Sequence, residues 1–248
     1  MSGDLISLRM LAITAARPDA ELLRQGAGQA SVPIEFLAVD GTAAVAALAK
    51  GGIDIVVLDG NLPQASRADI IKAARAARPA PFVVATAPSA DVRIDGTDGT
   101  VIKPASAEDA RKIAELCVRV KIPTRVLIVD DSGTMRSIVR KILSASRFAL
   151  AVHEAEEGIA ALNQLHSGNF GIVFLDYNMP GLNGFETLSE IKRELPNVAV
   201  VMMTSTLDNA IADRAHAAGA LAFLKKPFYP ADIDAVLERF YGLHPTGR

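Results

Sequence analysis

Five polar side chains in the second half of the chain each follow a short apolar run. They are Asp130 and Asp131 after VLIV, Asp176 after GIVFL, Thr204 after VAVVMM, and Lys226 after AFLK. Because the carboxyl ends of parallel strands open onto one edge of a sheet, we expect these side chains to converge in one crevice. The sequence therefore predicts a site with three carboxylates, a hydroxyl and an ammonium group.

Such a site favours a bound cation, because three neighbouring carboxylates repel one another and each is costly to desolvate. Magnesium suits this donor set, since it prefers oxygen ligands and retains waters that a phosphoryl oxygen can replace. The ammonium and the hydroxyl would bind the other phosphoryl oxygens. The chemistry that this predicts is phosphoryl transfer onto a carboxylate, in which positioning and charge neutralisation supply most of the catalysis.

Residues 124–248 resemble the receiver domain of bacterial two-component response regulators, through the acidic pair and the segments FLDYNMPGLNG and LKKPF. The resemblance implies that Asp176 is phosphorylated and belongs to the metal site. It implies that Asp131 binds magnesium directly and that Asp130 holds a water on the metal. The backbone carbonyl of Asn178 completes the implied ligand set.

The same resemblance assigns three further roles. Thr204 is the switch hydroxyl, Lys226 is the lysine that binds the phosphoryl group, and Phe223 is the aromatic residue that rotates inward on phosphorylation. The segment DDSGTMRSIVRKIL resembles the single-domain receivers of chemotaxis. The fold implied is a flavodoxin-like (βα)5 α/β domain, with a five-stranded parallel sheet covered by helices on both faces.

The first half of the chain repeats this plan. IDIVVLDGNLP aligns with GIVFLDYNMP, FVVATA with VVMMTS, and VIKPAS with LKKPFY. These matches pair Asp59, Thr86 and Lys103 with Asp176, Thr204 and Lys226, respectively. The sequence therefore predicts two receiver-like domains, a degenerate one over residues 1–120 and a phosphoacceptor domain over residues 124–248.

The first copy departs from the pattern at the place of the acidic pair. Its first strand, LRMLAIT, ends in Thr14 and is followed by two alanines. Without that pair, Asp59 has little with which to hold magnesium. Asp19 and Asp40 are the nearby acids that would have to replace the missing ligands. We interpret residues 1–120 as a receiver that no longer takes phosphate and is kept for binding.

The first copy also lacks a helix and an aromatic residue. From Thr86 to Lys103 is 17 positions, whereas from Thr204 to Lys226 is 22. The missing residues fall where the second copy has LDNAIADRAHAAGA, a good helix former, and the first has PSADVRIDGTDGT, which is poor in helix formers. The fourth helix is therefore predicted to be short or absent. Thr100 occupies the place of Phe223.

Composition is consistent with a cytoplasmic signalling protein of two domains. The chain has 248 residues, half of them apolar, and a net charge of -2. It has no long basic run, so neither nucleic acid nor membrane is expected as a partner. It also has no apolar stretch of about 20 residues and no basic leader. Cys117 is expected to be a buried core residue, and Ser106 to cap a helix that runs almost directly into the second domain.

These observations predict a response regulator rather than an enzyme, apart from its own slow dephosphorylation. Its expected partners are a sensor histidine kinase or phosphotransfer protein and a downstream protein that reads the changed surface. A second copy of the chain is a further candidate partner. After two receivers, YGLHPTGR is too short for a DNA-binding output, so output by contact is expected.

Two alternative functions compete with this prediction. A phosphate sink or scaffold, in which the first receiver only docks or dimerises, would carry the same motifs. Phosphohydrolases of the haloacid-dehalogenase type also use an aspartate nucleophile with magnesium, but they need a second aspartate two positions after it. This chain has Asn178 there, and its acidic pair comes first in the chain rather than last.

Overall fold

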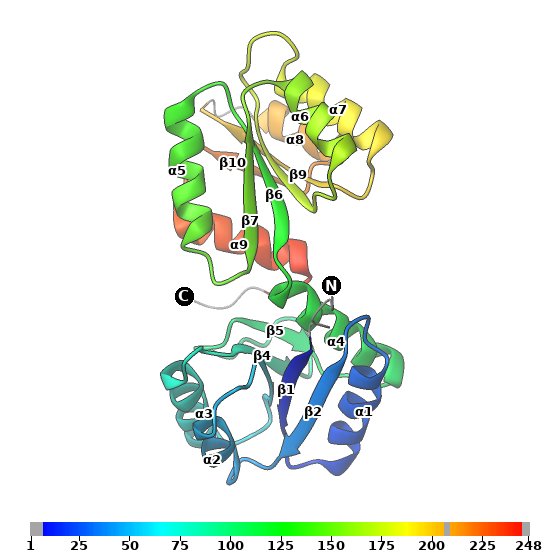
Figure 1. Cartoon of the computed structure of the whole chain (residues 1–248), viewed down its shortest axis with the longest axis vertical. Coiled ribbons are helices and arrows are strands. Elements are labelled where there is room, and N and C mark those ends of the chain that lie inside the picture. Colours follow the sequence, from blue (N-terminus) through cyan, green and yellow to red (C-terminus); the bar gives the residue numbers. More distant parts are fainter. Residues whose placement is uncertain (1–6, 206–208, 245–248) are drawn as a thin grey trace, which may run out of the picture. The chain divides into compact units, whose positions relative to one another are not determined.

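The chain, described by a computed structural model over residues 7–205 and 209–244, forms two compact units (Figure 1). One unit holds residues 7–121 together with residues 241–244, and the other holds residues 122–205 and 209–240. The chain therefore passes from one unit to the other twice. Each unit has its own sheet and its own core.

The first unit is built around a parallel sheet of five strands in the order β2-β1-β3-β4-β5. The strands are β1 (Leu8–Ile13), β2 (Ile34–Val39), β3 (Ile55–Asp59), β4 (Phe82–Ala87) and β5 (Gly99–Ile102). The helices are α1 (Arg17–Gly28), α2 (Ala44–Ala49), α3 (Gln64–Ala76) and α4 (Ala107–Lys121). In Figure 1, α1 and α4 cover one face of the sheet, and α2 and α3 cover the other.

The second unit repeats this order with a further helix. Its strands are β6 (Thr124–Val129), β7 (Leu150–Ala155), β8 (Ile172–Asp176), β9 (Ala199–Thr204) and β10 (Ala222–Lys225), arranged β10-β9-β8-β6-β7. Its helices are α5 (Gly133–Ser144), α6 (Gly158–Ser167), α7 (Gly184–Glu194), α8 (Asn209–Ala217) and α9 (Pro230–Tyr241). Figure 1 shows α5 and α9 on one face and α6, α7 and α8 on the other. The predicted α/β fold class, with two flavodoxin-like sheets, is confirmed.

The central strands are apolar because helices bury both of their faces. Every residue of β3 (IVVLD) and of β8 (IVFLD) is buried, including the terminal aspartates. Continuous runs of this kind are typical of parallel sheets, and each fully buried Val, Leu, Ile or Phe side chain contributes about 1.5–3 kcal/mol. The aspartate at the end of each strand is thus held by a rigid element.

Polar caps set where several helices begin. Ser132 precedes α5, and its hydroxyl accepts a hydrogen bond from the Met135 N–H. Asn183 and Glu186 form a reciprocal capping box at the start of α7. As predicted, Ser106 caps α4 by accepting from the Asp109 N–H at 3.2 Å. Helix α4 ends two residues before β6 begins, which confirms the short connection.

The fourth helix of the first unit is absent, as predicted. Residues 88–98 form turns, whereas α8 lies between β9 and β10 of the second unit. The carboxylate of Asp98 joins this segment to the sheet by accepting from the Val83 N–H at 2.7 Å and from Arg75 Nη1 at 2.9 Å. The free edge of β5 is met by an antiparallel bridge between Thr100 and His244.

Candidate functional site

The carboxyl edge of the second sheet gathers the predicted polar groups. Strand β6 leads into Asp130 and Asp131, β8 ends at Asp176, β9 ends at Thr204, and β10 leads into Lys226. Strand β8 lies between β6 and β9, so Asp176 occupies the middle of this edge. The adjacency that the strand-end argument predicts is therefore present.

An ammonium group joins two of the carboxylates. Lys226 Nζ lies 2.7 Å from Asp130 Oδ2 and 2.9 Å from Asp176 Oδ1. Asp130 and Asp176 are 1% and 5% exposed, whereas Asp131 is exposed. The other oxygen of Asp130 accepts from the Ser132 N–H at 2.9 Å, which orients the carboxylate. One ammonium thus faces two buried acids.

Burial raises the pKa of Asp176, although Lys226 acts to lower it. The neighbouring Asp130 carboxylate raises the pKa further, because two like charges disfavour one another. A second cation at this edge would counter both effects and favour the ionised, nucleophilic form of Asp176.

The donor set fits magnesium. Oxygens of Asp130, Asp131 and Asp176 lie within 4.8 Å of one another. Asp176 Oδ1, although ion-paired with Lys226, accepts no well-aligned hydrogen bond from the part of the chain that the structure describes. Carboxylate oxygens with a free acceptor position are the ligands that a hard divalent cation binds. Asn178 follows two residues after Asp176, and its N–H hydrogen-bonds to the Asp176 carboxylate.

Thr204 and Phe223 lie on the two strands beside the acids. Thr204 is fully buried, and its carbonyl accepts from the Lys226 N–H at 2.6 Å. Phe223 is half-buried and packs against the core on the face of the second sheet that α6, α7 and α8 cover. Lys225 is exposed, unlike its neighbour Lys226. The Lys226–Pro227 peptide bond is cis.

The corresponding edge of the first unit carries internal ion pairs in place of an acid cluster. Lys103 Nζ lies 2.5 Å from Asp19 Oδ2 and 3.3 Å from Asp59 Oδ2. The Thr14 hydroxyl donates to Asp59 Oδ2 at 2.9 Å. Burial acts to lower the pKa of Lys103, but Asp19 and Asp59 outweigh it, so the net pKa is raised. These groups surround a cavity of about 10 Å³, which is room for at most about one water molecule.

Asp19 and Asp40, the two acids that would have to replace the missing acidic pair, are not placed as metal ligands. Asp19 pairs with Lys103 instead. Asp40 accepts from the N–H and hydroxyl of Thr42 and from the Ala43 N–H, so its carboxylate closes its own turn. Over the described ranges 7–205 and 209–244, the group at Asp176 is the one place where three potential ligand residues meet.

Strand register corrects one expected equivalence. In the first unit Asp59 pairs with Thr86, whereas in the second unit Asp176 pairs with Met203. The counterpart of Thr86 is therefore Met203, and the alignment of Thr86 with Thr204 is shifted by one residue. Register in a parallel sheet is set by backbone pairing, which an alignment of two apolar runs does not detect.

A second pair of hydrogen bonds leads to the same correction. The Lys103 N–H donates to the Ala87 carbonyl at 2.7 Å, and the Lys226 N–H donates to the Thr204 carbonyl. Ala87 thus occupies the position of Thr204, whose hydroxyl is the predicted switch group. The first unit therefore lacks this hydroxyl as well as the acidic pair. It also lacks the aromatic residue, because Thr100 pairs with Ala85 where Phe223 of the second unit pairs with Met202.

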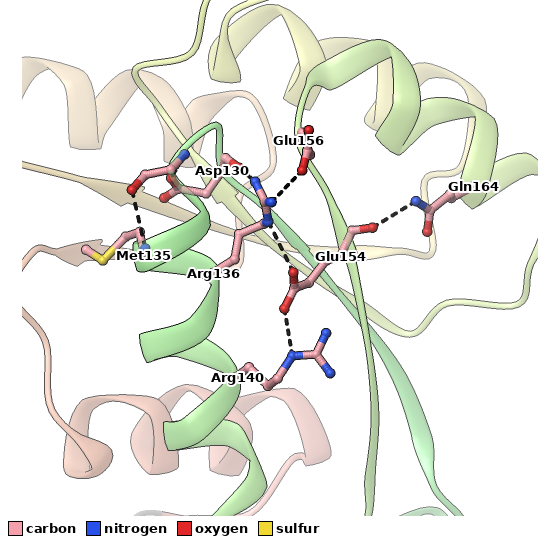
Figure 2. Close-up of polar contacts among 8 residues, drawn as sticks. Asp130, Met135, Arg136, Arg140, Glu154, Glu156 and Gln164 are labelled. Atoms are coloured by element: carbon pink, nitrogen blue, oxygen red, sulfur yellow. Dashed lines mark hydrogen bonds and ion pairs between the residues drawn. The ribbon is translucent and has the colours of Figure 1, made fainter.

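Sequence reasoning missed an arginine beneath the acidic loop. Arg136 on α5 donates to the Asp130 carbonyl and pairs with Glu154 and Glu156 (Figure 2). A basic residue in the first turns of an amphipathic helix usually faces solvent, so nothing in its type or spacing distinguished it. Its contacts depend on where β7 lies relative to α5.

Comparisons with known proteins agree with this geometry. Residues 126–238 match the family model "Response regulator receiver domain". Chemotaxis protein CheY-3 of Vibrio cholerae is 35% identical over 119 residues, covering 47% of this chain and 91% of that protein. Chemotaxis protein CheY of Pseudomonas aeruginosa is 34% identical over 119 residues, covering 47% of this chain and 95% of that protein.

One solved structure matches both units together. It is described as a probable two-component system response regulator/GGDEF domain protein, and it covers 95% of this chain and 98% of its own chain with a TM-score of 0.54. At 21% identity this likeness shows the fold. The family model and the two chemotaxis proteins show a receiver domain, and the chain belongs to the response regulator receiver family. Among the described residues no helix has the length and apolar character needed to cross a bilayer.

Proposed function

We propose that the chain is a response regulator of a two-component phosphorelay that accepts a phosphoryl group on Asp176. The observation that carries this proposal is the cluster of Asp130, Asp131 and Asp176 with the Lys226 ammonium between two of its members. Lys226 balances one charge of the three, and the donor set suits magnesium for the rest. The donor would be a phosphohistidine of a sensor kinase or phosphotransfer protein.

The transfer exchanges one bond to phosphorus for another. An Asp176 carboxylate oxygen attacks phosphorus, an oxygen–phosphorus bond forms, and the nitrogen–phosphorus bond of the donor breaks. The leaving imidazole nitrogen takes a proton from solvent. Magnesium held by Asp130, Asp131, Asp176 and the Asn178 carbonyl would supply neutralisation of the phosphoryl charge. Lys226, already 2.9 Å from Asp176, would stay with the incoming phosphoryl oxygens.

Phosphorylation would also withdraw the ammonium from Asp130, because the acyl phosphate carries more charge than the carboxylate. The Thr204 hydroxyl would donate to the phosphoryl group and shift the conformational equilibrium of β9 and β10, on which Phe223 lies. Both described units are receivers, so within these residues the signal leaves through a protein surface. Slow hydrolysis of the acyl phosphate would reset the protein.

The first unit would serve as a receiver that does not take phosphate. Lys103 is already engaged by Asp19 and Asp59, and Thr14 stands where the acidic pair begins. The cavity there has room for about one water, so a phosphoryl group would not fit without rearrangement. Its role in this proposal is to bind a partner.

The test is magnesium-dependent labelling of the full chain by a small phosphodonor such as acetyl phosphate, followed on a phosphate-affinity gel. Asp176→Asn should abolish the shifted band, and Asp59→Asn should leave it at the parent level. A chelator should abolish the band in the parent. Labelling that survives Asp176→Asn and disappears with Asp59→Asn would overturn the assignment of both units.

A further inference from the structure

Arg136, a largely buried cation, lies at the start of α5 next to the acidic loop (Figure 2). Its side chain is 11% exposed. Nη1 donates to the Asp130 carbonyl at 2.8 Å, Nε to Glu154 Oε2 at 3.1 Å, and Nη2 to Glu156 Oε1 at 2.6 Å. All three guanidinium nitrogens therefore have acceptors, and the acceptors come from the end of β7, the residues after it, and the loop after β6.

A guanidinium in this arrangement fixes the backbone that it holds. The guanidinium is planar and its N–H donors have a fixed geometry. When Nε and Nη2 bind two carboxylates, the direction in which Nη1 donates is therefore set as well. Glu154 is itself held, because Gln164 of α6 donates to its carbonyl at 2.9 Å (Figure 2). The Asp130 carbonyl thus meets a donor whose position is set by neighbouring elements.

The first unit shows what accompanies the loss of the acids. Helices α1 and α5 each begin four residues after the preceding strand ends, so Ala20 occupies the position of Arg136. Strand β2 pairs with β1 as β7 pairs with β6, which places Ala38 at the position of Glu154. The arginine and its principal carboxylate partner are both missing in the unit whose loop begins with Thr14.

We infer that Arg136 is a positioning residue for the magnesium-binding acids, acting through the carbonyl of Asp130. Held there, the loop directs Asp130 and Asp131 toward Asp176 before any metal arrives. This inference rests on the proposed function, because magnesium binding at this edge is part of that proposal.

Arg140 supplies a matched control from the same helix. It lies one turn after Arg136 and pairs with the same acid, Glu154 Oε1, at 2.6 Å, but it is 49% exposed, and among the described residues it makes no hydrogen bond or ion pair with the loop after β6 (Figure 2). Removing either arginine takes a cation from Glu154. Removing Arg136 alone releases the Asp130 carbonyl.

The experiment compares metal affinity in full-length Arg136→Gln, Arg136→Lys and Arg140→Gln. Free Mn²⁺ is measured by electron paramagnetic resonance, and Mg²⁺ is titrated as competitor. Arg136→Gln should raise the dissociation constant by about 10-fold or more, the order of effect seen for residues that orient metal ligands. Arg136→Lys, which keeps the positive charge but donates from a single nitrogen, should recover part of the loss, and Arg140→Gln should stay within about twofold of the parent.

A second readout separates positioning from stability. Arg136→Gln should need more Mg²⁺ for half-maximal labelling by acetyl phosphate, yet approach the parent extent of labelling at saturating Mg²⁺. Thermal unfolding in chelator monitors the fold of every variant. If Arg136→Gln and Arg140→Gln bind Mn²⁺ alike while the parent binds metal and is labelled, the positioning role is wrong. If the parent chain neither binds metal nor is labelled by acetyl phosphate, the proposed function itself is wrong.

Discussion

The two units have the same sheet order and differ most at the carboxyl edge of the sheet. In the second unit this edge holds an acid cluster that is short of positive charge, with one lysine for three carboxylates. In the first unit Lys103 is matched by Asp19 and Asp59, and the third acid position is the neutral Thr14. The first edge is thus left with one unbalanced negative charge, whereas the second has two, the charge that one divalent cation neutralises.

This difference shows which residues carry the fold and which carry the chemistry. Apolar strands buried on both faces form the same sheet in each unit, whatever follows their carboxyl ends. Substitutions at a few strand ends then separate a site that needs a metal from one that is closed. The missing fourth helix adds a second difference, because residues 88–98 replace a helix with turns.

The sharpest test of the comparison removes the lysine from each edge. Lys226→Met should lower the stability of the second unit in chelator by about 3–5 kcal/mol, because it leaves buried acids without their partner. Magnesium should restore most of that stability, while labelling by acetyl phosphate falls about 100-fold. Lys103→Met should cost less, since that lysine is 25% exposed, and magnesium should restore nothing. Calorimetric unfolding with and without magnesium measures both.

Lys225→Met is the control for Lys226→Met, since Lys225 is the exposed residue directly before it, at the end of β10. It should leave the unfolding curve and the labelling unchanged. Magnesium rescue of Lys103→Met would contradict the comparison, because it would mean that the first edge also holds metal.

Restoring the acidic pair should convert the first edge toward the second. In Thr14→Asp/Ala15→Asp the new carboxylates would face Asp59 and destabilise the first unit in chelator through like-charge repulsion. Magnesium should then stabilise that unit, by about 2.7 kcal/mol at 100 times the dissociation constant. The parent first unit should show no such response in calorimetry. A double variant that magnesium does not stabilise would show that the closed cavity, rather than the missing acids, excludes the metal.

The turns that replace the fourth helix should depend on Asp98. Asp98→Ala leaves the Val83 N–H without its acceptor inside the first unit and removes the partner of Arg75. We expect a loss of about 1–3 kcal/mol, the cost of an unsatisfied buried donor. Asp95→Ala, an exposed change in the same segment, should cost less than about 0.5 kcal/mol. Equal effects in urea unfolding would refute the structural role of Asp98.

The smallest effect is expected at Cys117, in α4 of the first unit. The thiol is fully buried, as predicted, and burial raises its pKa to about 12. Because the unfolded thiol ionises near pH 8.5, its contribution to stability is present below that pH and is lost as the pH rises toward 12. At pH 8 a disulfide reagent should react with the unfolded chain in urea and leave the native chain unmodified. Rapid reaction of the native chain would show that this helix opens.

The sequence alone determined the fold class, the repeat and the convergence of the acids. Apolar runs of strand length, each ending in a polar residue, are sufficient for this, because parallel strands present their carboxyl ends together. The loss of the fourth helix was also predictable, since proline, glycine and aspartate in residues 88–98 oppose helix formation. Local composition and strand order therefore predicted the frame of the site.

Tertiary structure decided the register and the partners. Thr86 and Thr204 align in sequence. Backbone pairing nevertheless makes Ala87, rather than Thr86, the first-unit residue equivalent to Thr204, since register depends on hydrogen bonds between strands. The sequence offered Asp19 only as a nearby acid that would have to replace a missing ligand, and the structure pairs it with Lys103. Long charged side chains such as Lys103 in the first unit and Arg136 in the second can reach several neighbours, and the packing of helix against sheet selects among them.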